Sequence, residues 1–194
     1  MYHSLRLTVF ALASLIYSCA HSSDHDSEHH HTDATQSEHI EQDVALTDSL
    51  EANRYDNIYF SAQPEKSDWQ KLKDQGFTTI INLRSPREYD EKEERETLAS
   101  LGMTYHNVAF EPRADLDDTY IDEVTKHVMA NRKKGKILIH CASGARVGIW
   151  LAGHFYKDHG MSKDEALATA KALGLDRPGA IEKAQKYLSN QAEK

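Results

Sequence analysis

The chain has 194 residues, of which 39% are hydrophobic and 28% are charged, and its formal net charge is −8. Seven of the 31 acidic residues but only one of the 23 basic residues lie in residues 1–43. The remainder is therefore close to neutral and has no basic stripe of the kind that binds nucleic acid. The two cysteines, Cys19 and Cys141, are too few for a disulfide-stabilised scaffold.

Residues 1–19 have the pattern of a secretory signal peptide. Arg6 precedes the apolar run 7–17, which is too short to span a bilayer. The segment 16–19, Ile-Tyr-Ser-Cys, resembles a bacterial lipobox, so we expect Cys19 to carry a lipid that anchors an exported protein to a membrane. We expect the periplasmic side, and the outer membrane is favoured because no Asp follows Cys19. The alternative is an ordinary signal peptide with an incidental cysteine.

Residues 20–43 are predicted to be a disordered tether, because they contain too few apolar side chains to build a core. Six histidines lie among acidic residues in this segment: His21, His25, His29, His30, His31 and His39. Imidazoles beside carboxylates can bind zinc or copper weakly. A solvated spacer is the alternative interpretation.

Residues 44–194 have the composition of one globular domain. Hydrophobic periodicity and capping residues predict strands at 57–60, 77–83, 103–110 and 137–139. The same signals predict helices at 67–75, 88–101, 117–134 and 147–158, another after Ser162, and a last one at 178–189. Strands that alternate with helices in this way indicate an α/β fold, with a central, mainly parallel sheet flanked by helices. We expect the site at the carboxyl edge of that sheet.

The stretch 136–150 is the most informative part of the sequence. A short apolar strand, 137–139, is followed by Cys141, then by small residues and Arg146, and then by an apolar helix. A strand, a tight loop and a helix N-terminus make a cradle for an anion, because the first amides of a helix have no partners within the helix. A cysteine at the mouth of this cradle is expected to be a thiolate near neutral pH. The Cys loop, residues 141–146, is thus predicted to lie between the last core strand and the following helix.

Three segments together resemble the dual-specificity-phosphatase-like superfamily. They are Ile58–Pro64, Gly76–Arg84 and His140–Arg146. The bacterial branch that they match is the beta-lactamase-hydrolase-like phosphatase domain, and the resemblance covers about residues 55–160. It implies a cysteine-dependent phosphatase of the phosphomonoester or protein-tyrosine type, which acts on a phosphorylated small molecule or protein.

The resemblance assigns roles to the residues of the Cys loop. Cys141 corresponds to the nucleophile that forms a phosphocysteine, and Arg146 to the phosphate-binding arginine. The rest of the phosphate-binding loop is Ala142, Ser143, Gly144 and Ala145. A guanidinium can bind two phosphate oxygens at once, and fixed donors of this kind stabilise charge without a metal or other cofactor.

Other residues are implied in supporting roles. His140 is expected to orient the loop, and Arg84, like Arg113, to add positive charge at the sheet edge. The family places an acidic residue that protonates the leaving group on a loop before the Cys loop, and four candidates lie there: Glu111, Asp115, Asp117 and Asp118. We choose Asp115, because it precedes the helix and is the least suited to cap it.

Two departures from the superfamily pattern leave alternatives open. Four residues, rather than five, separate Cys141 from Arg146, and Val147 occupies the position where a Ser or Thr often follows the arginine. The shorter loop also resembles that of rhodanese sulfurtransferases, in which the cysteine carries a persulfide. Val147 predicts a slow second step of hydrolysis. A catalytically weak, oxyanion-binding module is therefore a third interpretation.

Overall fold

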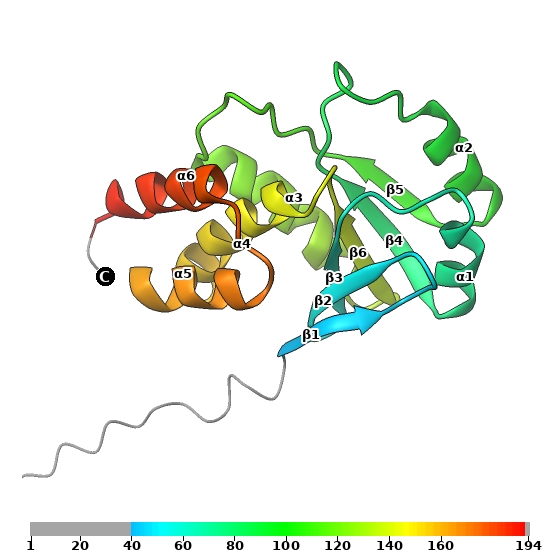
Figure 1. Ribbon diagram of the computed structural model, residues 1–194, viewed down its shortest axis with the longest axis horizontal. Coiled ribbons are helices and arrows are strands. Elements are labelled where there is room, and N and C mark those ends of the chain that lie inside the picture. Colours follow the sequence, from blue (N-terminus) through cyan, green and yellow to red (C-terminus); the bar gives the residue numbers. More distant parts are fainter. Residues whose placement is uncertain (1–39, 193–194) are drawn as a thin grey trace, which may run out of the picture. The chain divides into compact units, whose positions relative to one another are not determined.

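The computed structural model describes residues 40–192, and Figure 1 shows their arrangement. Six strands form one sheet: β1 (Ile40–Ala45), β2 (Glu51–Tyr55), β3 (Ile58–Ser61), β4 (Phe77–Asn82), β5 (Thr104–Asn107) and β6 (Lys136–His140). Six helices accompany them: α1 (Asp68–Asp74), α2 (Lys92–Ser100), α3 (Asp118–Asn131), α4 (Ala145–Asp158), α5 (Lys163–Ala172) and α6 (Pro178–Ser189).

The strand order in the sheet is β1-β2-β3-β6-β4-β5. Strands β3, β6, β4 and β5 are parallel, whereas β1 and β2 form an antiparallel hairpin that continues into β3. In the register of the sheet, His140 lies opposite Ser61 on one side and Asn82 on the other. The carboxyl ends of β3, β6 and β4 therefore meet at one edge of the sheet, and Cys141 directly follows β6 there. The predicted mainly parallel α/β fold is confirmed.

Helices cover both faces of the sheet (Figure 1). Helices α1 and α2 contact β4 and β5 on one face, around a core that includes Trp69, Leu72 and Leu98. The other face carries α3 and α4, and α5 and α6 pack against α4. The hydrophobic side chains on both faces come from the periodic positions of the sequence, because each helix buries one stripe against the sheet.

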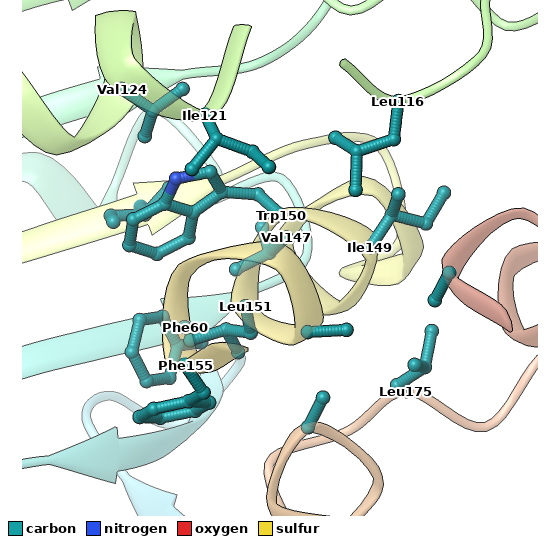
Figure 2. Packing of buried hydrophobic residues seen from close by; sticks show 14 of the residues in the cluster. Phe60, Leu116, Ile121, Val124, Val147, Ile149, Trp150, Leu151, Phe155 and Leu175 are labelled. Carbon is teal, nitrogen blue, oxygen red and sulfur yellow. The ribbon is translucent and has the colours of Figure 1, made fainter. Parts of the chain in front are cut away.

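Helix α4 is the most deeply buried helix of the second face. All ten residues from 147 to 156 are buried, and Figure 2 shows how the side chains of Val147, Trp150 and Phe155 point from this helix into the surrounding core. Neighbouring segments approach the helix closely at Gly148, where an added Cβ would lie 2.8 Å from Leu175 Cβ. A helix packed on all sides cannot shift easily, so it holds its N-terminus firmly at the Cys loop.

The structure corrects the predicted boundary of the globular domain. Strand β1 begins at Ile40, so residues 40–43 belong to the sheet and not to the tether that was predicted to end at residue 43. The β1–β2 hairpin was missed as well. Only Ile40, Val44 and Ala45 are apolar in β1, and a bulge between Glu41 and Val44 breaks the alternation that identifies a strand.

Several predicted ends differ from the observed ones. Helix α2 begins at Lys92 rather than residue 88, and β5 covers Thr104–Asn107 rather than 103–110. Strand β5 pairs only with β4, so it has one neighbour to hold it. Helix α4 begins at Ala145, two residues earlier than predicted, because Gly144 completes the turn before it. Within residues 40–192, no helix is long and apolar enough to cross a membrane.

Candidate active site

Cys141 lies at the carboxyl end of β6, at the base of a short loop that leads into α4. Its side chain is buried and forms no disulfide. Gly144 has a φ of +84°, in the left-handed region that favours glycine, and α4 begins directly after it. An antiparallel bridge between Ala62 and Ser143 ties the loop to the end of β3. The strand, loop and helix N-terminus are therefore arranged as an anion cradle requires.

Arg146 lies in the first turn of α4 and is fixed by two contacts. Its Nη1 donates to the carbonyl oxygen of Leu83 at 3.1 Å, and its Nη2 lies 2.8 Å from the carboxylate of Glu88. A guanidinium has five N–H groups, so three remain for a ligand. The loop thus presents a cation whose orientation is set before any anion binds.

Glu88 holds two arginines at once. Besides Arg146, it accepts a hydrogen bond from Nε of Arg84 at 3.2 Å. Burial raises the pKa of the Glu88 carboxyl, but the hydrogen bonds and charges of Arg146 and Arg84 outweigh burial and bring it below the ordinary value. The guanidinium of Arg84 also lies 4.0 Å from the ring centre of Tyr89. Arg84 therefore lies beside Arg146 through their shared partner Glu88, and its role of adding positive charge at the sheet edge stays a prediction.

His140 pairs with a glutamate in the interior. Its Nε2 lies 2.9 Å from Oε1 of Glu94, and both side chains are almost completely buried. Gln63 donates to the other carboxylate oxygen of Glu94 at 3.0 Å. Burial raises the pKa of Glu94, but the hydrogen bonds and charge of His140, with hydrogen bonds from Tyr89 and Gln63, bring it below the ordinary value. The pair fixes the backbone just before Cys141.

These contacts form one continuous path around the Cys loop. Gln63 links the pair of His140 and Glu94 to the arginines, because its Oε1 accepts from Nη1 of Arg84 at 3.2 Å. The path runs through His140, Glu94, Gln63, Arg84, Glu88 and Arg146. It starts one residue before Cys141 and ends at the arginine of the loop. Sequence analysis missed Glu88 and Glu94, because both lie in a charged segment that looks like a solvated helix face.

The four acidic residues of the segment 111–118 all have protein partners. Glu111 accepts from Ser85 Oγ at 2.7 Å, Asp117 caps α3 by accepting from the amide of Tyr120, and Asp118 accepts from the hydroxyl of Tyr187. Asp115 is largely exposed and lies 2.7 Å from Nζ of Lys186. The hydrogen bond and charge of Lys186 hold the pKa of Asp115 below its ordinary value. The assignment of Asp115 as general acid stays a prediction, and it requires this contact to open.

Two further residues define the surroundings of Cys141. Val147, labelled in Figure 2, is buried in a hydrophobic cluster to which Cys141 also belongs, and a valine at this position offers no hydroxyl to the thiol. Burial raises the pKa of the Tyr120 hydroxyl, and the negative charge of a Cys141 thiolate adds to that effect. Sequence analysis did not single out Tyr120, which looks there like one more apolar position of α3.

The Glu94 carboxylate is expected to stabilise the folded state. Because hydrogen bonds to a buried charged group are worth about 1.5–3 kcal/mol, Glu94→Gln should lower the free energy of unfolding at pH 7 by about that amount. The folded-state pKa of Glu94 is depressed, so its contribution is present above the ordinary glutamate pKa of about 4.3 and is lost as the pH falls further. Denaturant unfolding between pH 3 and 7 measures it.

The matched control is Glu93→Gln, one residue earlier on α2, where the carboxylate is exposed and forms an ion pair with Lys66. It should change stability little at any pH. If the two variants behave alike, or if the gap between wild type and Glu94→Gln persists at low pH, the proposed contribution of the buried pair is contradicted.

Comparisons with known proteins point to one group of folds. No family model and no curated protein sequence matches the chain. Among solved structures, TpbA from P. aeruginosa superposes with a TM-score of 0.63 at 22% identity, over 81% of this chain and 94% of TpbA. A Cys-to-Ser form of TpbA in complex with phosphotyrosine matches with a TM-score of 0.58 at 19% identity, covering 81% of this chain and all of the other.

A third solved structure, kinase associated phosphatase with its catalytic-site cysteine replaced by serine, matches with a TM-score of 0.54 at 16% identity. The match covers 70% of this chain and 89% of that protein. The identities are low, so these structures establish the architecture. The chain has the α/β fold of the protein-tyrosine-phosphatase-like cysteine phosphatases.

Proposed function

We propose that the protein is a cysteine-dependent phosphatase that hydrolyses a phosphomonoester through a phosphocysteine intermediate. The observation that carries the proposal is the joint position of Cys141 and Arg146. Cys141 begins the tight turn between β6 and α4, and Arg146 follows it in the first turn of α4, at the carboxyl edge of a phosphatase-like sheet, with the arginine already oriented by Glu88.

The geometry supports a two-step reaction. In the first step, the Cys141 thiolate attacks phosphorus, an S–P bond forms, and the P–O bond to the leaving group breaks. Arg146 and the amides of residues 142–146 would stabilise the charge on the phosphoryl oxygens. A carboxylic acid, for which we propose Asp115, gives the leaving oxygen its proton. In the second step, water attacks phosphorus and releases phosphate and the thiolate.

The substrate that we propose is a phosphorylated protein or small molecule. The phosphotyrosine complex of TpbA supports an aryl phosphate as one class. We further propose that the protein acts outside the cytoplasm and is itself held at a membrane by a lipid on Cys19. That proposal, and weak metal binding by His21–His39, depend on residues 1–39, which lie outside the described residues.

Sulfur transfer is the less favoured alternative. The solved structures compared above include phosphatases and a phosphotyrosine complex, whereas the argument for a rhodanese-like reaction is the short loop spacing. The third interpretation, a weak oxyanion-binding module, rests on Val147, which is buried and has no hydroxyl to help remove the phosphoryl group from Cys141. The three functions can be distinguished by which substrate the protein turns over and by which group Cys141 carries during the reaction.

Hydrolysis of p-nitrophenyl phosphate is the direct test of the proposed function. The wild-type chain should release p-nitrophenol, and Cys141→Ser should reduce kcat/KM to background, because a hydroxyl in this loop is a far weaker nucleophile than a thiolate. Lys126→Ala, which removes an exposed lysine of α3, should leave the rate unchanged. Sulfur transfer from thiosulfate to cyanide without phosphate release would instead support the rhodanese-like alternative.

The role of Asp115 predicts a pH shift in a variant of its partner. Lys186→Met removes the cation that lowers the pKa of Asp115, so that pKa should rise. A general acid works in its protonated form, so the alkaline limb of the kcat/KM profile should move to higher pH for an alkyl phosphate, whose leaving group needs a proton.

Asp115→Asn should remove that alkaline limb and slow alkyl phosphate hydrolysis by about 10²–10⁴-fold. It should affect p-nitrophenyl phosphate far less, because p-nitrophenolate leaves without a proton. An unchanged alkaline limb in both variants would assign the acid role to another residue.

Val147 predicts that the second step is slow. Wild type should show a burst of p-nitrophenol followed by slower turnover, because phosphocysteine forms faster than water removes it. Val147→Thr adds a hydroxyl at nearly constant volume and should raise the steady-state kcat by up to about tenfold, which corresponds to 1.4 kcal/mol. Val147→Ala, which adds no hydroxyl, should not. Linear kinetics without a burst in wild type would contradict the prediction.

A further inference from the structure

A cavity adjoins the Cys loop on the side of α6. It has a volume of about 270 Å³, and its walls include three cationic side chains, those of Arg146, Arg177 and Lys183. Arg146 comes from the first turn of α4, Arg177 directly precedes α6, and Lys183 lies within α6. The cavity is therefore continuous with the arginine that we propose to bind phosphate.

The charged side chains that line this cavity are all cationic. Its lining contains no acidic residue, although the chain as a whole has a net charge of −8. The first turns of two helices also border it, Ala145 and Arg146 of α4 and Gly179 and Ala180 of α6. Neither helix carries an acidic residue in its first turn. Helix N-termini attract anions, so both add to the three side-chain charges.

Two of the cations, Arg177 and Lys183, have N–H groups that can still donate hydrogen bonds to a ligand. The side chain of Arg177 is exposed and has no hydrogen-bond or ion-pair partner within residues 40–192. Nζ of Lys183 donates to the carbonyl oxygen of Ala114 at 2.7 Å, which leaves two of its three N–H groups. Lys186, one turn from Lys183, is different, because its charge is neutralised by Asp115. Arg177 and Lys183 thus have no carboxylate partner.

The remaining wall is apolar. Phe110, Pro112 and Ile149 line it, and Phe110 is held in place by Tyr120, whose ring centre lies 4.7 Å away. An apolar wall in a cavity that also presents three cations favours a ligand with an apolar or aromatic body and more than one negative group. The phosphoryl group would occupy the Cys loop, and the second anion would reach Arg177 and Lys183.

We propose that this cavity is a second anion subsite, which selects phosphomonoesters that carry a further negative group beyond an apolar or aryl body. The inference rests on the proposed phosphatase function, and it adds a substrate class. Arg177 acts as a specificity residue that contacts the second anion. Lys183 contacts the same anion and holds the loop of Asp115 through the carbonyl of Ala114.

The test compares two substrates that differ by one charge, phenyl phosphate and 3-carboxyphenyl phosphate, on the full chain. Exposed charge pairs are worth about 0.2–1 kcal/mol each, so two of them should favour the carboxylated ester by roughly two- to thirtyfold in kcat/KM, mainly through KM. Arg177→Glu should abolish or reverse this preference, measured as the ratio of the two kcat/KM values. The preference should shrink in 0.5 M NaCl, because salt screens exposed charges.

Lys126→Glu makes the same charge change on an exposed position of α3 outside the cavity and should preserve the preference. Arg177→Ala removes the cation without introducing a carboxylate, so it controls for effects of the new negative charge. It should remove the preference without reversing it. An equal rate on both esters in wild type, or a preference that survives Arg177→Glu, overturns the subsite while the phosphatase proposal stands.

A binding measurement separates this inference from the function on which it rests. Calorimetry on Cys141→Ser, with the same two esters as ligands, needs no turnover. Tighter binding of the carboxylated ester, lost on adding Arg177→Glu, supports the subsite even if wild type hydrolyses neither compound. Equal affinity for both esters, or no binding of either, contradicts it.

Discussion

The Glu88 carboxylate is the interaction on which the candidate site depends most. It pairs with both Arg84 and Arg146. Its negative charge offsets the repulsion between the two guanidinium groups, so both can lie at the sheet edge. Gln63 links this group to the buried pair of Glu94 and His140. The residue before Cys141 and the arginine at the end of the loop are thus fixed by one network, and the loop between them is held at both ends.

The packing of α4 explains why so short a loop is possible. The helix is buried along ten consecutive residues, so its N-terminus has a fixed position relative to β6. Gly144 turns the chain in the left-handed conformation, and α4 starts at once. With one residue fewer than the superfamily pattern, the loop still brings Arg146 toward the Cys141 edge. The same packing buries Val147, which relates the fold directly to the predicted slow second step.

The parallel part of the fold could be predicted because its signals are local. The β-branched run of β4, the apolar β6 and the capping box at Ser162 each specify their element without reference to the rest of the chain. The β1–β2 hairpin could not be predicted, because its polar, bulged first strand owes its structure to pairing with β2. Long-range pairing leaves little trace in a single sequence.

The candidate site divides in the same way. Cys141, Gly144 and Arg146 lie close together in sequence, so their pattern can be read there, whereas Glu88, in the segment between β4 and α2, and Glu94, in α2, come near the loop only when the chain folds. The most direct test of the central claim is mass spectrometry of the Cys141 peptide after rapid quenching of a reaction with p-nitrophenyl phosphate. The account predicts a phosphoryl group on Cys141. An unmodified peptide during turnover, or a persulfide formed from thiosulfate in its place, would contradict it.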